Sequence, residues 1–331
     1  GAKKKKEKME TPNSDLPQLL IIRPPAIPNL FKDLLQEKYN LLDPVESGLP
    51  TREFFEIHGP SIRALVSVGP GAVTAELIGY LPALALVVGS SAGVDHIDLA
   101  ECHRRGIVVT NVGDSFSEDV ADYAVGLLID VLRGMSTSDG FVRAGLWPVK
   151  ENFPLGSKVG SKRVGIVGLG SIGSLTAKRL EAFGCSIAYN SRTKKPSVHY
   201  PYYANVHELA ANSDVLIVCC ALTNETYHII NKDVMKALGK QGVIINVGRG
   251  SLIDEKELVQ FLVRGEIGGA GLDVFEDEPN VPKELYGLDN VVLSPHKAVS
   301  TPETLAAARQ MVLDNLKAFF SNKPVLSPVK V

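Results

Sequence analysis

Short apolar runs alternate with amphipathic segments along almost the whole chain, and this alternation restricts the fold more than any other feature. Runs such as 19–22 and 215–219 have the length of strands, and glycine or proline marks many of their boundaries. A segment with helical spacing of apolar residues follows most of them. Strands that alternate with helices form parallel sheets covered by helices on both faces. The sequence therefore predicts an α/β protein.

At 331 residues, the chain is long enough for two domains of about 150 residues each. We expect two doubly wound units. A longer helix is expected over 117–133, with Ser117 as its N-cap and acidic residues in its first turn. The predicted strands are 19–22, 64–68, 84–88, 107–110, 164–167, 186–189, 215–219, 243–247, 269–274 and 291–293. The other predicted helices are 30–39, 52–58, 74–80, 95–105, 172–183, 206–211, 232–238, 255–264 and 302–320.

Composition excludes several partners. The formal net charge of −2 provides no large basic field for nucleic acid or anionic lipid. Lys3–Lys6 is interpreted as a solvated tail rather than a binding element. No apolar run reaches the length of a membrane span, and no secretory or peroxisomal signal is evident. The four cysteines fit buried thiols in a reducing compartment, so we expect a cytoplasmic protein without a metal ion.

A glycine motif follows the strand predicted at 164–167. Gly168, Gly170 and Gly173 form G-x-G-x-x-G, and Ser171 and Ile172 open the next helix. In such a motif the first glycine permits a tight turn, the second lets a pyrophosphate approach, and the third lets the helix pack on the sheet. The helix N-terminus favours an anion. The motif therefore predicts dinucleotide binding, and a purely structural turn is the alternative.

The segment after the next predicted strand bears on the choice of dinucleotide. Enzymes that use NAD place a carboxylate there to accept from the ribose hydroxyls. This chain has hydroxyls and cations instead, at Ser191, Arg192, Thr193 and Lys194. Such groups suit the additional phosphate of NADP, because a guanidinium binds phosphate through two prongs. We therefore expect NADP, with NAD bound more weakly; a solvated basic loop is the alternative.

Three polar residues follow three successive predicted strands. Arg249, Glu278 and His296 each lie just beyond a strand, where ligands of open α/β sheets bind. Each residue taken alone would be interpreted as a surface or turn residue. Their occurrence together behind a dinucleotide motif favours a catalytic group.

With these motifs the chain, from about Leu19 to Leu316, resembles the D-isomer-specific 2-hydroxyacid dehydrogenase family, particularly the plant-type glyoxylate/hydroxypyruvate and hydroxyphenylpyruvate reductases that prefer NADPH. The resemblance implies that Arg249, Glu278 and His296 form the active site for a small 2-oxo acid. It also implies a homodimer. The implied domains are a discontinuous, flavodoxin-like substrate domain (1–113 plus 297–331) and a Rossmann cofactor domain (114–296), with hinges near Gly113 and His296.

The residue types suit the reduction of a 2-oxo acid. His296 can donate a proton to the carbonyl oxygen near neutral pH, and Glu278 can orient its ring. Arg249 can hold the substrate carboxylate and polarise the carbonyl. Asp273 is interpreted as a structural residue or a contact to the cofactor ribose. For the substrate we expect contacts from Ser91, Ala92 and Gly93, before a helix N-terminus, and from Val68 and Gly69.

Two departures from the family pattern and two alternatives remain. Lys297 follows His296, the predicted proton donor, at a position where relatives often have a small or apolar residue. Gly248 precedes Arg249 at a position where alanine is common in the family. The alternatives are a regulatory NAD(P)-sensing protein of the same fold and a dehydrogenase that acts on formate or phosphoglycerate.

The pocket that would distinguish the side chains of different 2-oxo acids is predicted near Arg52, Phe54 and Phe55.

Overall fold

The chain forms two compact units in a computed structural model that describes residues 16–150 and 152–329. Unit 1 comprises Gly1–Ser115 and Ala306–Val331, and unit 2 comprises Phe116–Leu305. The predicted domain ends were 113 and 296, whereas the two units divide after Ser115 and after Leu305. The second division differs more from the prediction, because it lies inside the last helix, Pro302–Phe320. The lysine run at 3–6 and the final two residues lie outside the described part of the chain. Within that part, no helix is long and apolar enough to cross a membrane.

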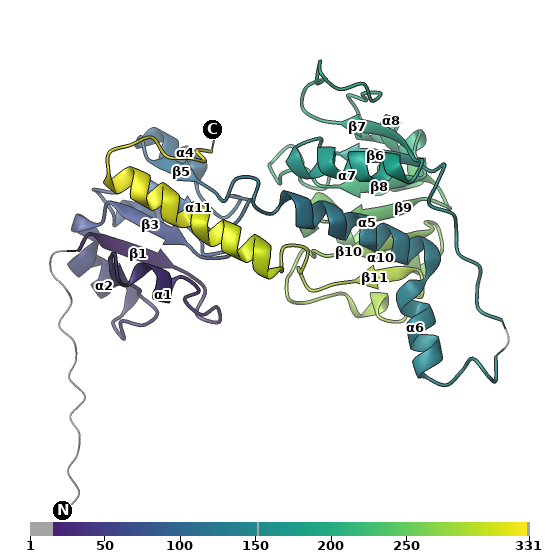
Figure 1. The fold of residues 1–331 in the computed structure, drawn as a ribbon, viewed down its shortest axis with the longest axis horizontal. Coiled ribbons are helices and arrows are strands. Elements are labelled where there is room, and N and C mark those ends of the chain that lie inside the picture. Colours follow the sequence, from purple (N-terminus) through teal and green to yellow (C-terminus); the bar gives the residue numbers. More distant parts are fainter. Residues whose placement is uncertain (1–15, 151, 330–331) are drawn as a thin grey trace, which may run out of the picture. The chain divides into compact units, whose positions relative to one another are not determined.

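Unit 1 contains a parallel sheet of five strands in the order β2-β1-β3-β4-β5 (Figure 1). The first strand lies between the second and the third, which is the flavodoxin-like order that the sequence predicted. The strands are β1 (Gln18–Ile22), β2 (Asn40–Leu42), β3 (Ala64–Ser67), β4 (Leu86–Gly89) and β5 (Val108–Thr110). The helices are α1 (Lys32–Leu35), α2 (Thr51–His58), the 3-10 helix η1 (Gly59–Ser61), α3 (Ala75–Gly79), α4 (Leu99–Arg104) and most of α11 (Pro302–Phe320).

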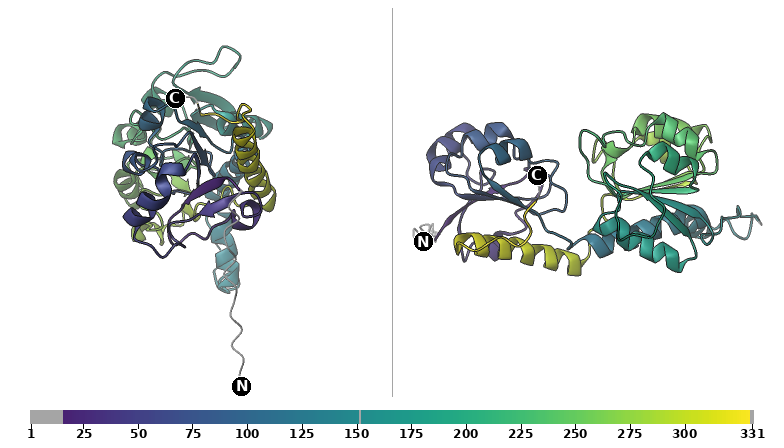
Figure 2. Two further views of the ribbon diagram at one scale, coloured as in Figure 1. Left: turned by 90° about the vertical axis from the view of Figure 1, so that its left-hand side faces the viewer. Right: turned by 90° about the horizontal axis from the view of Figure 1, so that it is seen from above.

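Both faces of this sheet are covered by helices. Leu20, Leu65, Val87 and Val109 are register partners across four strands, so their side chains share one face. They pack in one buried cluster with residues of α2, α3 and α4. The other face is covered by α11, the yellow helix that lies along the sheet of unit 1 in Figure 2. Its buried Val312 and Leu316 face the interior of unit 1.

Unit 2 contains a parallel sheet of six strands in the order β11-β10-β9-β8-β6-β7. The strands are β6 (Arg163–Val167), β7 (Ser186–Asn190), β8 (Val215–Val218), β9 (Val243–Asn246), β10 (Gly269–Leu272) and β11 (Val291–Leu293). The helices are α5 (Ser117–Arg133), α6 (Met135–Arg143), α7 (Ser171–Ala182), α8 (Val206–Ala211), α9 (Lys232–Leu238) and α10 (Glu255–Val263), with 3-10 helices η2 (Gly250–Leu252) and η3 (Lys283–Leu285).

In unit 2 the helices α5 and α7 pack together on one face of the sheet, and α8, α9 and α10 lie on the other (Figure 1). The approach of α5 to β10 is close, because a Cβ atom on Gly271 would lie 3.1 Å from the Cβ of Leu127. The chain order reverses between β6 and β8, since β6 leads on to β7 on its other side. Ligands of such sheets bind at this reversal, beyond the carboxyl ends of the strands.

Several predicted elements need correction. The short strand β2 and helix α6 were not predicted, and the helix expected over 30–39 is a single turn, Lys32–Leu35. Ser117 does not cap α5; it is the first helical residue and is buried, and Phe116 occupies the N-cap position without a side-chain hydrogen bond. The helix expected from residue 95 begins at Leu99, where the Asp98 side chain accepts from the Glu101 amide.

Candidate active site

The glycine motif joins β6 to α7 with the geometry that a dinucleotide requires. Gly168 has φ +97°, and a Cβ atom there would lie 2.5 Å from the Cα of Cys220, so only glycine fits. A Cβ on Gly173 would lie 2.1 Å from the Gly168 carbonyl oxygen, which explains the close packing of α7 on the sheet. Gly170, by contrast, faces open space. Its backbone and the exposed N-terminus of α7 at Ser171 are accessible to a pyrophosphate.

The basic segment 191–195 directly follows β7, as the sequence predicted. Arg192, Thr193 and Lys194 are exposed. The Ser191 hydroxyl donates to the Thr193 carbonyl at 2.7 Å, which shapes the turn. The charge of Arg192 also acts on Glu225. The pKa of Glu225 is lowered mainly by hydrogen bonds from the Thr223 side chain and from the backbone of Glu225, and to a smaller extent by the charge of Arg192. The segment thus presents positive charge at the end of the second strand of the unit.

A carboxylate orients the ring of His296. Its Nδ1 atom lies 2.8 Å from Oε2 of Glu278, and both side chains are partly exposed. The other carboxylate oxygen of Glu278 accepts from the Phe275 amide at 3.0 Å. Since an ionised carboxylate only accepts, the Nδ1 atom carries the proton in this pair, and the Nε2 atom is left for chemistry. His296 is also held at φ 53°, an uncommon backbone conformation for a non-glycine residue.

Charge keeps the Glu278 carboxylate ionised. Burial alone would raise the pKa of Glu278, but hydrogen bonds from His296 and Phe275 and the charges of His296 and Arg249 together lower the pKa below its ordinary value. The group therefore stays an anion through the neutral and mildly acidic range, and loses its charge only when the pH falls through that lowered pKa. An ionised carboxylate at this position accepts a hydrogen bond from the imidazole ring and holds its orientation.

Arg249 follows β9 and is held by its neighbours. The buried Asn246 side chain donates to the Arg249 carbonyl at 2.9 Å and accepts from the Gly248 amide at 3.0 Å. A Cβ on Gly248 would lie 2.7 Å from Cδ1 of Leu252, so alanine at this position would require the Leu252 side chain to shift. Asn246 was not predicted, although an asparagine at the end of a buried strand could have indicated it.

Asp273 has a structural task in the turn that carries His296. Its side chain is 1% exposed. One carboxylate oxygen accepts from the Ser294 hydroxyl at 2.6 Å and from the Lys297 amide at 2.7 Å, and the other accepts from the Ala298 amide at 3.0 Å. The Asp273 carbonyl accepts from the His296 amide at 2.8 Å. Of the two interpretations of Asp273, these bonds support the structural one, and a contact to the cofactor ribose stays a prediction.

In unit 1, the segment 91–93 follows β4, and its residues are half-buried. The Ser91 hydroxyl donates to the Gly93 carbonyl at 2.8 Å, and the Asn111 amide donates to the Ala92 carbonyl at 2.8 Å. Since α4 begins only at Leu99, the segment does not adjoin a helix N-terminus, and that part of the prediction was wrong. Asn111, which fastens the segment, was not predicted.

The pocket predicted near Arg52, Phe54 and Phe55 is wrong for the two phenylalanines. Phe54 is 2% and Phe55 4% exposed, and both belong to the core cluster of unit 1. Arg52 is exposed and pairs with Glu56 on its own helix. Neither phenylalanine can therefore line a pocket for a substrate, and a contact from Arg52 stays a prediction.

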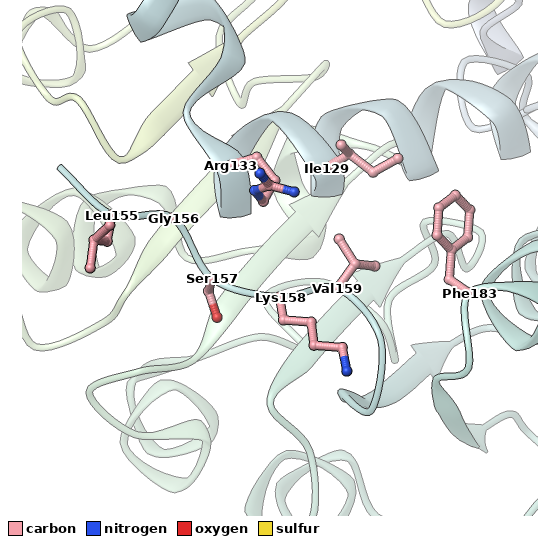
Figure 3. Close-up of a pocket in the computed structure, with 8 residues that line it drawn as sticks. All are labelled: Ile129, Arg133, Leu155, Gly156, Ser157, Lys158, Val159 and Phe183. Atoms are coloured by element: carbon pink, nitrogen blue, oxygen red, sulfur yellow. The ribbon is translucent and has the colours of Figure 1, made fainter. Parts of the chain in front are cut away.

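A cavity of about 490 Å³ lies away from these residues, between the end of α5 and the segment 155–159 (Figure 3). Ile129 and Arg133 line it from α5, Phe183 closes one side, and the rest comes from 155–159. No sequence motif falls on it. Thiol chemistry is not expected beside the glycine motif either, because burial raises the pKa of Cys220 to about 11 and raises that of Cys219 as well.

Comparison with known proteins agrees with this geometry. Residues 125–298 match the family model for the NAD-binding domain of D-isomer specific 2-hydroxyacid dehydrogenases. The chain is 58% identical to glyoxylate/hydroxypyruvate reductase HPR3 of Arabidopsis thaliana, over 96% of this chain and 99% of that relative. It is 51% identical to hydroxyphenylpyruvate reductase of Plectranthus scutellarioides, over 84% of this chain and 88% of the relative.

A solved structure of a related enzyme has the same fold as this chain. The NADPH-dependent glyoxylate/hydroxypyruvate reductase of Sinorhizobium meliloti, in complex with NADP and malonate, superposes with a TM-score of 0.87 and 39% identity, covering 95% of this chain and 96% of that one. A dinucleotide-type glycine loop with a histidine–glutamate pair in the same α/β unit defines an oxidoreductase that uses a nicotinamide cofactor. The chain belongs to the D-isomer specific 2-hydroxyacid dehydrogenase family.

Proposed function

We propose that the protein reduces small 2-oxo acids, such as hydroxypyruvate and glyoxylate, to D-2-hydroxy acids with NADPH. The observation that carries this proposal is the His296–Glu278 pair at 2.8 Å, in the same unit as the glycine motif. The relatives named above are glyoxylate/hydroxypyruvate and hydroxyphenylpyruvate reductases, which supports the same substrate class here.

His296 acts as the proton donor. As negative charge develops on the carbonyl oxygen, the Nε2 proton passes to that oxygen, and Glu278 stabilises the imidazolium before the transfer. Arg249 holds the substrate carboxylate and polarises the carbonyl through its planar fork, which a lysine cannot reproduce. In unit 1 we assign substrate contacts to the backbone of Ser91–Gly93 and of Val68–Gly69.

The residues of unit 2 fit NADPH, which supplies the hydride when bound. The open space at Gly170 and the amides at Ser171 and Ile172 suit the pyrophosphate. The segment 191–194, exposed from Arg192 to Lys194, suits the ribose phosphate, because it offers two cations and two hydroxyls where a carboxylate would repel that phosphate.

The reaction is tested by following the absorbance of the reduced nicotinamide with hydroxypyruvate, in parallel with NADPH and with NADH. We expect rapid oxidation of NADPH and slow oxidation of NADH, because the segment 191–194 favours the additional phosphate. Faster oxidation of NADH would leave the reductase and contradict the cofactor preference. No oxidation with hydroxypyruvate, glyoxylate or hydroxyphenylpyruvate would favour a nucleotide-sensing protein instead.

We also propose a homodimer, formed through α6 and the segment that follows it. Large apolar side chains are exposed there: Met135, Val142, Trp147, Val149 and Leu155, with Trp147 at 68% and Leu155 at 100%. A concentration of such side chains on a soluble protein marks an interaction surface. A second copy of this chain is the partner that the family resemblance implies.

Light scattering should therefore give twice the mass of the 35.6 kDa chain. Replacing Met135 and Val142 of α6 by glutamate should shift the protein to monomers, because two charges would have to be buried at the interface. The matched control is Val263→Glu, at an exposed valine of α10, which should leave the mass unchanged. Monomeric wild-type protein would overturn the proposal.

The cytoplasm is the compartment we propose. Cys102 and Cys185 are buried free thiols, and Cys219 and Cys220 are free and half-buried. Thiols of this kind persist in a reducing compartment.

A further inference from the structure

An apolar segment, Pro24–Leu30, lies at the carboxyl edge of the sheet in unit 1. It directly follows β1, which pairs with β3 in parallel register. The Val68 amide donates to the Ile22 carbonyl at 2.8 Å, so the end of β1 adjoins the residues that follow β3. Because parallel strands end at one edge, the segment shares that edge with Val68–Gly69 and with the segment after β4.

Ile27 brings this segment against the proposed substrate contacts. Its Cδ1 atom lies 3.2 Å from the position that a Cβ atom on Gly69 would occupy, and Gly69 has φ +59°. The Gly69 amide donates to the Ser90 hydroxyl at 2.9 Å, and Ser90 directly precedes Ser91. The half-buried Ile27 side chain therefore borders the row of backbone groups that we assign to the substrate.

A buried ion pair holds the segment in place. Arg23 and Asp43 are joined at 2.8 Å, and their side chains are 6% and 5% exposed. The same guanidinium donates to the Ile27 carbonyl at 2.6 Å and to Glu46 at 3.3 Å. Glu46 also accepts from Lys32 at 2.7 Å, just beyond the segment. Arg23 is thus a positioning residue that fixes the backbone of Ile27 and so limits the movement of the Ile27 side chain.

We propose that Ile27 contacts the side chain of the 2-oxo acid and selects substrates with an apolar or aromatic substituent. This inference rests on the proposed function. Pro24–Leu30 contains three prolines and no ionisable side chain, so the segment offers a mainly apolar surface of restricted backbone conformation and no countercharge for a charged substituent. Substrates with an aromatic substituent would bury apolar area against Ile27, whereas glyoxylate has no substituent to bury.

The test compares kcat/KM for phenylpyruvate and for glyoxylate in Ile27→Ala, with NADPH saturating. Shortening a pocket side chain by a few carbons changes discrimination by about tenfold or more. We therefore expect a loss of about tenfold for phenylpyruvate and a change below about twofold for glyoxylate. The matched control is Ile57→Ala, at an exposed isoleucine of α2 in the same unit, which should change neither value.

Equal losses for both acids in Ile27→Ala would mean that Ile27 only supports the structure, and would overturn the inference. An unchanged value for phenylpyruvate would overturn it as well. If wild-type protein reduces glyoxylate but not phenylpyruvate, the inference fails while the proposed function stands. If wild-type protein reduces no 2-oxo acid, the proposed function fails and the inference falls with it.

Discussion

His296→Ala is expected to lower kcat for hydroxypyruvate about a thousandfold, because a positioned general acid contributes about 10²–10⁴-fold. The variant removes the ring that Glu278 orients at 2.8 Å, and no proton donor then faces the developing oxyanion. Binding of NADPH should change by less than about twofold, since the glycine motif and the segment 191–194 are untouched. Steady-state kinetics and a fluorescence titration with NADPH measure the two quantities separately.

The matched control for this variant is His199→Ala, an exposed histidine of unit 2 that pairs with Glu181. Its kcat should equal that of the wild type. A His296→Ala enzyme with wild-type turnover would exclude His296 as the proton donor. A parallel loss of NADPH binding would mean that the substitution disturbs the cofactor site rather than the chemistry.

Arg192→Ala combined with Lys194→Ala should lower kcat/KM for NADPH about a hundredfold and leave the value for NADH within about twofold. Hydrogen bonds to charged groups contribute about 1.5–3 kcal/mol each, and exposure of both side chains places the effect at the lower end. NADH lacks the phosphate that these cations would bind. Initial rates with each cofactor, at one hydroxypyruvate concentration, give the ratio directly.

The control for the cofactor variant is Lys236→Ala with Lys240→Ala. It removes two exposed cations that shortly precede β9, at the amino end of that strand and not at the carboxyl edge of the sheet. This control should preserve the ratio of NADPH to NADH activity. Equal losses for both cofactors in the Arg192 and Lys194 variant would show that the segment supports the fold and does not bind the ribose phosphate.

Much of the fold could be predicted because local patterns determine it. The helices 206–211, 232–238 and 302–320 and the strand 291–293 agree with the structure residue for residue. The failures have local causes. The strand Asn40–Leu42 has three residues and shows no alternation, and α6 contains glycine, serine and threonine in place of a regular apolar stripe. Phe54 and Phe55 gave no local sign that they belong to the core.

The candidate site divides in the same way. G-x-G-x-x-G and the residues after each strand could be identified because a parallel sheet brings all carboxyl ends to one edge. Pairing of His296 with Glu278 was expected, but the turn that presents His296 depends on the buried Asp273 and its bonds to Ser294, Lys297 and Ala298. These contacts join residues more than twenty positions apart, and no sequence period reports such a contact.

By itself, the sequence determined the α/β class, the dinucleotide motif and the three polar residues that follow later strands. Each of these depends on neighbouring residues or on the repeated order of strands and helices. Only the tertiary structure decided where the last helix packs and what borders Gly69. Val312 and Leu316 are buried in unit 1, and the Ser327 hydroxyl donates to the Asn111 carbonyl at 2.6 Å. The physical reason is that burial is non-directional: an apolar face specifies that it must be covered, and the three-dimensional packing of distant segments selects what covers it.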